Sequence, residues 1–279
     1  MVSWHKDVPA IVFPTGSAPH IVSLRTIIWL ICLLLAPLLL RFFFVQVAKL
    51  DKTTAGLAAY NLTALAPNLY LVCVGARAWM FEDLSNVSGT YAGRLYASLP
   101  AGENVHSVTI AYEAWNSVAA IAIPEYRSWA FVGHHAVTLY LAVLGTHPFA
   151  HYYALFFLGL ASVSSVFLCV SDVFKHSAVL QEMAPTLALA LRLCFALSFL
   201  AVRTCMWPVM SFRFIKDVLD ACDAGVHYSQ WVACVYIGAN AFLTLLQGLW
   251  SWYIIRGIYK MLLPTSSDDS ETMRKEKRR

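Results

Sequence analysis

Long apolar runs, separated by short polar segments, dominate the sequence. Most of these runs approach the ~20 residues that a helix needs to cross the hydrocarbon core of a bilayer. The pattern therefore predicts an all-α, polytopic membrane protein with about seven transmembrane helices. One run is short, and we expect its helix to stand upright or to use the flanking Tyr126 and Trp129 at the membrane interface. The seven predicted helices are 27–47, 57–80, 105–123, 129–144, 149–170, 187–209 and 230–253.

The composition agrees with a membrane environment. Of the 279 residues, 59% are hydrophobic and only 13% are charged, whereas roughly a quarter of the residues are charged in a soluble domain. The mean hydropathy is +0.62. Because so few charges cannot cover a water-facing surface, lipid must contact most of the exterior. We expect one compact helical domain, followed by a tail at 264–279 whose serine and charge content predicts disorder.

Basic residues predict the orientation of the helices. With an odd number of helices the termini lie on opposite faces, and lysine and arginine gather on the C-terminal face, which is therefore predicted to be cytosolic. The lumenal face holds residues 1–26 and the acidic-leaning loops 81–104 and 211–229, the first with the sequon Asn86-Val-Ser. The net charge of +4 lies mainly on the cytosolic side, so no surface for nucleic acid is expected. The basic set is Lys49, Lys52, Arg127, Lys175, Arg256, Lys260, Arg274, Lys275, Lys277, Arg278 and Arg279.

This orientation gives a direct test. A protease added to sealed microsomes is expected to remove the tail at 264–279, while the loop around Asn86 stays protected in the lumen. Microsomes opened with detergent serve as the control, because there both segments become accessible. Protection of the tail in sealed microsomes would contradict the assignment.

The end of the tail predicts a location. Lys275 and Lys277 stand at the fifth and third positions from the C-terminus, which resembles the dibasic signal that returns membrane proteins to the endoplasmic reticulum. A basic tail held against anionic lipid is an equally open explanation. If the retrieval interpretation is correct, changing both lysines to serine lets the protein leave the endoplasmic reticulum, as fluorescence microscopy would show. An unchanged distribution would leave only the electrostatic explanation.

Polar side chains inside the predicted helices are candidates for function, because an ionisable group at the bilayer centre costs ~2.5–3.5 kcal/mol unless it finds a partner. Glu113 has two expected fates, an ion pair with Arg203 or a hydrogen bond to a neighbouring helix. His134 and His135 are turned ~100° apart on one helix, so we expect only one to point into a central cavity. The candidates are Glu113, Asn116, His134, His135, Thr138, Ser162, Ser164, Ser165, Arg192 and Arg203.

Several of these residues lie in segments that resemble the TLC-domain family, which includes the ceramide synthases. They are Gly133-His-His-Ala-Val-Thr-Leu-Tyr-Leu, Ala111-Tyr-Glu-Ala-Trp-Asn, Pro124-Glu-Tyr-Arg-Ser-Trp, the stretch 156–165 and Ala201-Val-Arg. The resemblance covers 57–262 and implies a six-helix barrel around a cavity open toward the cytosol. The helix 27–47 would then be an additional helix outside the barrel.

The resemblance does not extend to all of the residues that the ceramide synthases use for catalysis. Ceramide synthases pair the two histidines with a His-Asp-x-x-Asp stretch on the next helix, but the matching residues 161–165 read Ala-Ser-Val-Ser-Ser. A hydroxyl carries no charge to hold an imidazole in one tautomer. Asp172 lies a helical run further on, and Glu113 is the other carboxylate that would orient His135. We therefore expect weak or no synthase activity, with His134 and His135 as candidate catalytic residues and a lipid cavity lined by Glu113, Asn116, Thr138, Ser162, Ser165 and Arg203.

Other membrane-protein chemistries are disfavoured. A retinal protein needs a lysine in its last helix, and 230–253 has none. A di-iron lipid oxidase would use His147 and His151, but these lie at the opposite end of the fourth helix from His134, ~20 Å away. The seven cysteines lack metal-site spacing, and a disulfide between the two expected on the lumenal side stays open. No metal and no other cofactor is predicted. The cysteines in question are Cys205 and Cys222.

Two functions of different classes remain. The first is binding or handling of an acyl lipid or sphingolipid within the barrel, with acyl-CoA-dependent N-acyl transfer as its enzymatic form. The second is a non-catalytic subunit or cargo adaptor of a membrane protein complex. A carboxylate within hydrogen-bond reach of His134 or His135 would favour catalysis. The sequence identifies neither the lipid nor any protein partner.

Overall fold

The computed structural model describes residues 23–147, 149–226 and 229–262, and the regular structure in these ranges is helical. Most of the predicted N-terminal segment and the whole predicted tail lie outside the described residues. The elements are α1 (Leu24–Gln46), α2 (Lys52–Leu71), η1 (Val72–Ala76), α3 (Arg77–Phe81), α4 (Ser85–Ser88), α5 (Tyr91–Tyr96), α6 (Pro100–Ala122), η2 (Pro124–Tyr126), α7 (Trp129–Leu144), α8 (His151–Ala154), η3 (Leu155–Leu160), α9 (Ser162–Lys175), α10 (Ala178–Met183), α11 (Pro185–Phe199), η4 (Leu200–Met206), α12 (Trp207–Asp223) and α13 (Gln230–Leu262).

Every apolar run that the sequence singled out is helical, so the predicted all-α membrane fold is confirmed. Five helical stretches are long and apolar enough to cross a membrane, and α7 is a shorter apolar helix. The seventh, α6, has 23 residues but is less apolar, since His106, Glu113 and Asn116 lie along it. Three of the stretches are composite rods, named here α2–α3, α8–α9 and α11–α12, in which a π-helical segment joins two α-helices.

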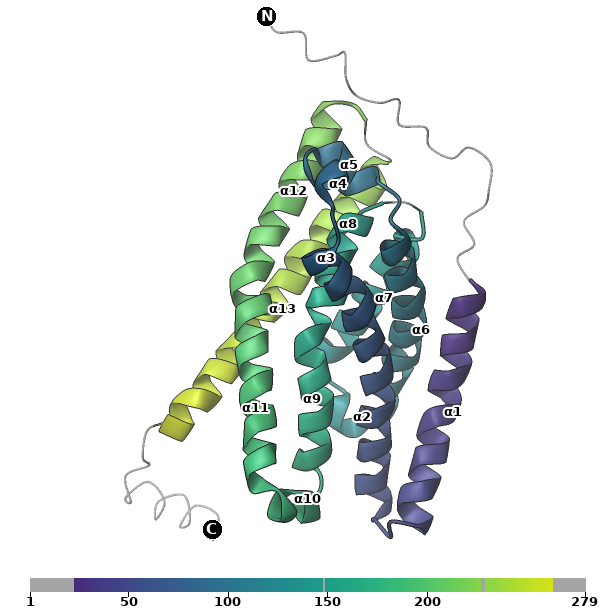
Figure 1. Cartoon of the computed structure of the whole chain (residues 1–279), viewed down its shortest axis with the longest axis vertical. Coiled ribbons are helices and arrows are strands. Elements are labelled where there is room, and N and C mark those ends of the chain that lie inside the picture. Colours follow the sequence, from purple (N-terminus) through teal and green to yellow (C-terminus); the bar gives the residue numbers. More distant parts are fainter. Residues whose placement is uncertain (1–22, 148, 227–228, 263–279) are drawn as a thin grey trace, which may run out of the picture.

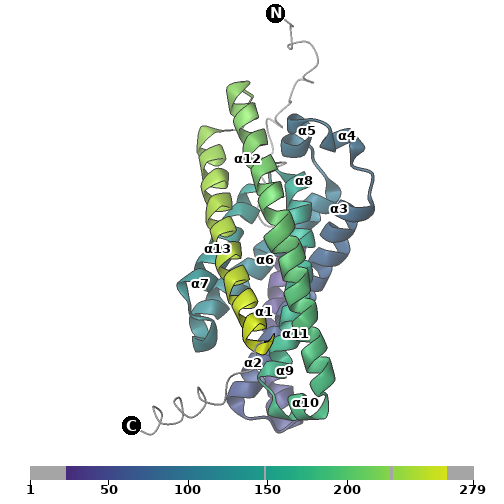
Figure 2. The same ribbon diagram turned by 90° about the vertical axis from the view of Figure 1, so that its left-hand side faces the viewer.

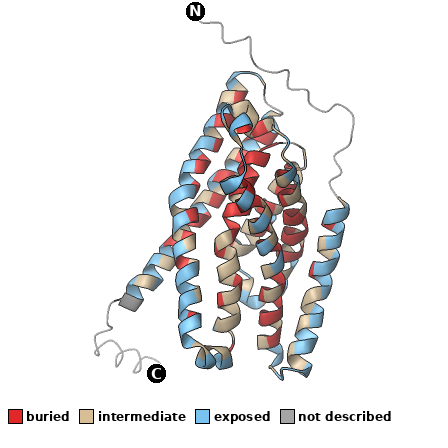
Figure 3. Ribbon diagram, viewed as in Figure 1, coloured by how far each residue is buried: buried red, intermediate tan, exposed pale blue. Residues whose placement is uncertain are grey.

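Six of the seven long helices form a closed ring. Going around it, α2 packs on α9, α9 on α11, the α11–α12 rod on α13, α13 on α7, α7 on α6, and α6 returns to α2. Helix α1 packs on the outside against α2 and α6 (Figures 1 and 2). Figure 3 shows buried residues concentrated inside the ring, while α1 is exposed along almost its whole length. The ring and its outer helix match the arrangement that the resemblance implied.

The two ends of the bundle differ in sequence. Figure 1 places α10 and the α1–α2 connection at one end, the α10 end, and α4 and α5 at the other, the α5 end. Lys49, Lys52 and Lys175 therefore share the α10 end, as the predicted orientation requires. Asn86 lies in α4 at the α5 end and is exposed.

One expectation for the lumenal side is wrong, and the open question of a disulfide there is answered. The segment 211–229 is mostly helix, because α12 continues unbroken to Asp223 and makes the α11–α12 rod 39 residues long. Cys205 and Cys222 lie on this same rod, 17 residues or ~25 Å apart, far beyond the reach of a disulfide. All seven cysteines are free. The sequence missed the continuation because the polar face of α12 resembles a loop in hydropathy.

Glycine lets two rods touch backbone to backbone at the centre of the bundle. Segment η1 crosses η3 there, with Gly75 and Gly159 at the crossing point. A Cβ built on Gly159 would lie 2.6 Å from the Cα of Gly75, and one on Gly75 would lie 2.7 Å from the Cα of Gly159. Neither position therefore has room for a side chain.

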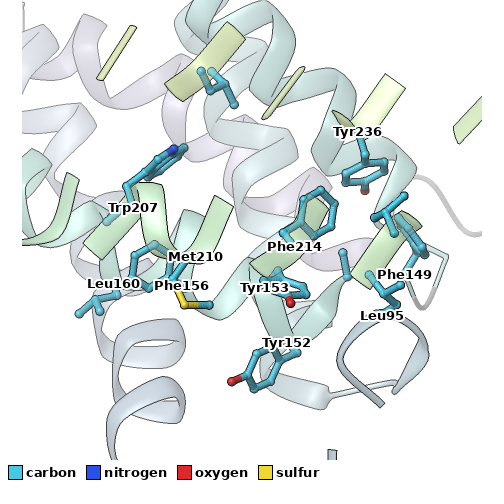
Figure 4. Close-up of a cluster of buried hydrophobic side chains, with 14 of the residues drawn as sticks. Leu95, Phe149, Tyr152, Tyr153, Phe156, Leu160, Trp207, Met210, Phe214 and Tyr236 are labelled. Atoms are coloured by element: carbon cyan, nitrogen blue, oxygen red, sulfur yellow. The ribbon is translucent and has the colours of Figure 1, made fainter. Parts of the chain in front are cut away.

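A buried ion pair ties the α5 end together. Arg94 on α5 donates through Nε and Nη2 to both carboxylate oxygens of Asp217 on α12, each at 2.6 Å. The Tyr153 hydroxyl donates to the same carboxylate at 2.5 Å. These hydrogen bonds raise the pKa of Arg94 above its ordinary value, with Asp217 the largest cause. Figure 4 shows the hydrophobic cluster to which Tyr153 belongs, in which the Phe214 ring contacts both Tyr153 and Tyr236.

Breaking this pair should weaken the fold. Removing one partner of a buried, hydrogen-bonded ion pair costs ~3–5 kcal/mol, because the other charge is left uncompensated. We expect Arg94→Met and Asp217→Leu each to lower the unfolding temperature in detergent, and the double variant to be less destabilised than the two effects added. Arg213→Met is the control, since Arg213 is exposed and makes only a long bond, at 3.3 Å, among the described residues, to the Ser88 carbonyl that Arg94 also contacts. Strictly additive effects would show that the two side chains are not coupled.

Candidate functional site

A carboxylate and an imidazole form a close pair inside the ring. Glu113 on α6 and His135 on α7 are both buried, and the Oε2 atom of Glu113 lies 2.5 Å from Nδ1 of His135. Because a carboxylate only accepts hydrogen bonds, this contact places a proton on Nδ1 and leaves Nε2 as the basic nitrogen. Of the two carboxylates considered as partners of His135, Glu113 is therefore the one that orients it.

Asn116, Tyr60 and Phe131 also hold the His135 side chain in place. The Nδ2 atom of Asn116 lies 3.2 Å from Nδ1 and 3.1 Å from Nε2 of His135. Tyr60 on α2 donates to Oδ1 of Asn116 at 2.5 Å, which orients the amide. The Phe131 ring packs edge-on against the imidazole, with centroids 4.4 Å apart. His135 is thus fixed by hydrogen bonds and by packing, as a group that handles protons requires.

His134 occupies a different environment from its neighbour. Its ring packs edge-on against Trp250 of α13 and against His135, with centroids 5.3 and 5.0 Å apart. Its Nδ1 atom is buried and has no hydrogen-bond partner among the described residues. Thr138, four residues on, donates to the His134 carbonyl at 2.8 Å, so its hydroxyl closes on its own helix.

Arg203 is placed by a π-helical segment. It lies within η4 of the α11–α12 rod, where the irregular turn carries its side chain into the ring. Nε donates to Ser164 Oγ at 2.9 Å, and Nη2 donates to the Ala161 carbonyl at 3.0 Å and to Ser165 Oγ at 3.1 Å. The small, polar stretch 161–165 therefore serves as the binding partner of a guanidinium. Of the two expected fates of Glu113, the structure has the hydrogen bond to a neighbouring helix, because Glu113 pairs with His135 of α7 and not with Arg203.

Two chambers flank these residues. The inner chamber, of about 120 Å³, extends toward the α5 end, and the outer chamber, of about 270 Å³, extends toward the α10 end. Tyr153 and Phe214 close the far side of the inner chamber, while Asp172 and Tyr253 line the outer one. The residues that line both chambers form the shared wall and are Tyr112, His134, His135, Ser165 and Arg203.

Most of the candidate residues line the chambers, whereas Arg192 is exposed on α11. Both histidines face both chambers, so the expectation that only one would point into a cavity is wrong. Glu113, Thr138 and Ser162 line the inner chamber. Asn116 lines neither, since it stands behind His135 with no exposed surface. His151 lies apart from this group, at the Gly145 end of α7, where Nε2 contacts the Gly145 carbonyl.

Several lining residues escaped the sequence analysis. His106, Thr109 and Asn240 line the inner chamber, and Tyr60 and Tyr126 line the outer one. The first three are polar residues within predicted apolar helices, so the rule that singled out Glu113 applies equally to them. The tyrosines carried no such signal, because tyrosine is ordinary in membrane helices.

Glu113, His134 and His135 are also the residues that could hold a metal ion. Their ligand atoms lie within 4.8 Å of one another. A metal ion would have to replace the contact that Glu113 already makes with His135. The single negative charge of these three residues would also leave one charge of a divalent cation uncompensated in the membrane interior, which is costly. The prediction that no metal is bound stays a prediction.

The sequence of this chain matches one known protein family. A family model described as the TLC domain matches residues 56–256, which is more than half of the chain. The chain belongs to the TLC-domain family. The match includes all six helices of the ring and leaves α1 outside it. No curated protein matches this sequence.

Proposed function

We propose that this TLC-domain protein binds an acyl lipid in its two chambers and that His135, held by Glu113, moves the proton in an acyl transfer to an amine. The observation that carries the proposal is the 2.5 Å contact between Glu113 and His135 in the shared wall. A buried imidazole with one nitrogen held by a carboxylate keeps a basic second nitrogen, and the amine would have to displace the Asn116 amide from Nε2 to reach it. The apolar ring around it suits a hydrocarbon chain.

The proposed reaction uses an acyl thioester and a lipid amine. The amine nitrogen attacks the thioester carbonyl carbon, a C–N bond forms, and the C–S bond breaks. His135 accepts the proton that the amine loses and returns a proton to the departing thiolate. Glu113 stabilises the imidazolium that exists between the two transfers. The products are an amide and a free thiol, and no oxidant, reductant or metal is consumed.

Weak synthase activity was expected because residues 161–165 contain no carboxylate. Glu113 supplies a carboxylate from a different helix, so that reason no longer applies. Acyl transfer is therefore the better supported form of lipid handling. Acyl-CoA and a sphingoid base are the proposed substrates, and the endoplasmic reticulum is the proposed location, on the evidence of Lys275 and Lys277.

The test is an assay on the purified protein in lipid nanodiscs. It is supplied with long-chain acyl-CoA and a sphingoid base, and the amide product is measured by mass spectrometry beside a His135→Ala variant. We expect turnover by the wild type and none by the variant. Lipid that co-purifies with each protein is measured in parallel, to show whether the chambers are occupied.

The outcomes separate the open functions. Bound acyl lipid without amide formation would overturn the catalytic part and leave a lipid-binding protein. No bound lipid and no turnover would overturn the whole proposal and favour the non-catalytic subunit or cargo adaptor. Turnover that survives in His135→Ala would overturn the assigned role of His135.

A further inference from the structure

Most of the buried polar atoms without a hydrogen-bond partner among the described residues lie around the inner chamber. Seven buried side-chain nitrogen or oxygen atoms lack a hydrogen-bond partner among the described residues, and five of them belong to residues that line the inner chamber. They come from three helices, with both ring nitrogens of His106 and Oγ1 of Thr109 on α6, Nδ1 of His134 on α7, and Oδ1 of Asn240 on α13. His106, Thr109 and Asn240 are each more than nine-tenths buried.

Other hydroxyl and amide groups in the bundle, including Asn68 of the same chamber, bond to their own helix. Thr63 donates to the Ala59 carbonyl at 2.7 Å, Asn68 donates to Ala64 at 2.7 Å, and Ser251 donates to Gln247 at 2.6 Å. This local bond is the usual way to satisfy a hydroxyl or amide within a membrane helix. Thr109 lacks it, although the carbonyl four residues earlier is available in α6. A buried polar group left without a partner costs ~1–3 kcal/mol, so several converging on one cavity indicate that something there bonds them.

The chemistry of these groups defines what fits. A neutral histidine and a threonine hydroxyl each donate and accept, while the free oxygen of Asn240 only accepts. A hydroxyl group, which both donates and accepts, matches this mixture better than an ion. The remaining lining is largely apolar and includes Leu71, Leu141 and Leu243. At about 120 Å³ the chamber has room for roughly four waters or a short chain segment.

We propose that the inner chamber is a subsite for a hydroxylated segment of the acyl chain. This inference rests on the proposed function, because it takes the reacting carbonyl to lie beside His135. Thr109 is four residues from Glu113 along α6, or ~6 Å, a distance that about five carbon–carbon bonds of an extended chain cover. The preferred hydroxyl therefore lies near the sixth carbon, within reach of Thr109 and Asn240.

Matched fatty acids test the subsite. Decanoic acid, 6-hydroxydecanoic acid and 2-hydroxydecanoic acid compete with radiolabelled decanoic acid for the detergent-purified protein at one detergent concentration. A gain of one well-made buried hydrogen bond corresponds to about tenfold in affinity. We expect the wild type to prefer the 6-hydroxy acid over decanoic acid about tenfold, and to show no such preference for the 2-hydroxy acid.

Variants identify the residues responsible. Thr109→Val combined with Asn240→Leu keeps the side-chain shapes but removes the polar atoms, and should reduce the preference to near one. Ser107→Ala is the control on the same helix, since Ser107 faces α1, where Ser23 donates to its hydroxyl at 3.4 Å. A size-exclusion profile equal to that of the wild type shows that each variant is folded. All variants are assayed in the same detergent micelles. Differences in how the acids partition into the micelles therefore cancel when variants are compared.

Each outcome has one meaning. A 6-hydroxy preference that disappears only in the double variant supports the subsite. Equal binding of the three acids by the wild type, or a preference that survives the double variant, overturns the subsite while leaving chain binding intact; the chamber then holds water only. Failure of the wild type to bind any of the acids overturns the subsite together with the proposed function.

Discussion

Replacing Glu113 with glutamine is expected to lower acyl transfer by about 10⁴-fold, the loss that follows removal of the orienting carboxylate in a well-studied catalytic triad. Glutamine keeps the shape of the side chain but carries no charge to stabilise an imidazolium. Its amide can also donate to Nδ1 of His135, which would favour the wrong tautomer. Because Glu113 acts through His135, the loss should fall on turnover, with little change in the acyl-CoA concentration that gives half-maximal rate.

The control variant for this prediction changes a residue on the same helix. Glu103→Gln should leave turnover unchanged, because Glu103 lies in the first turn of α6 and accepts only an exposed hydrogen bond from Ser98 at 3.0 Å. The amount of co-purified lipid should be equal in the wild type and in both variants. Wild-type turnover by Glu113→Gln would show that another carboxylate orients the histidines. Asp172, which lines the outer chamber, would be the next candidate.

The second large effect is expected at the crossing of η1 and η3. Gly159→Ala should destabilise the bundle by about 3 kcal/mol, at the upper end of the cost of overpacking, because the added methyl group would meet rigid backbone. The Cβ would lie 2.6 Å from the Cα and 2.7 Å from the carbonyl carbon of Gly75, and 2.9 Å from the amide nitrogen of Ala76. The two rods would have to separate, and the inner chamber beside them would lose its shape. Size-exclusion profiles after heating would measure the loss.

The chain offers glycines that serve as matched controls. Gly238 and Gly248 lie within α13, and a Cβ at either position would meet nothing within 4 Å. Alanine there should be neutral or stabilising by up to about 1 kcal/mol, since it is the better helix former. If Gly159→Ala were as stable as these variants, the two rods would not be in backbone contact.

Polar groups in this protein have two distinct roles. At the α5 end, Arg94 and Tyr153 both donate to Asp217, and Arg94 also donates to the Ser88 carbonyl, which suits a structural closure. Around the inner chamber, His106 and Asn240 keep atoms without a partner among the described residues. Unsatisfied groups in a membrane fold are costly unless a ligand or water reaches them. This difference supports the proposal that the chamber holds a ligand.

The sequence by itself determined the helices and the polar residues that had to face inward. Hydropathy is a local property of some twenty consecutive residues, so α1, α7 and α13 could be located without knowledge of their neighbours. The high cost of a charge in lipid likewise showed that Glu113 and Arg203 must turn into the protein. The histidine pair and its flanking segments were sufficient to indicate the family.

Only the tertiary structure decided which of those residues meet. Glu113 and His135 are 22 positions apart and on different helices, so their contact depends on how α6 and α7 pack. Arg203 reaches Ser164 rather than Glu113 because a π-helical segment changes the direction of its side chain, an irregularity that hydropathy does not reveal. The chambers are likewise a product of packing, since they exist only in the space that six helices leave between them. Local sequence sets which segments cross the membrane, whereas side-chain contacts between distant segments set the chemistry.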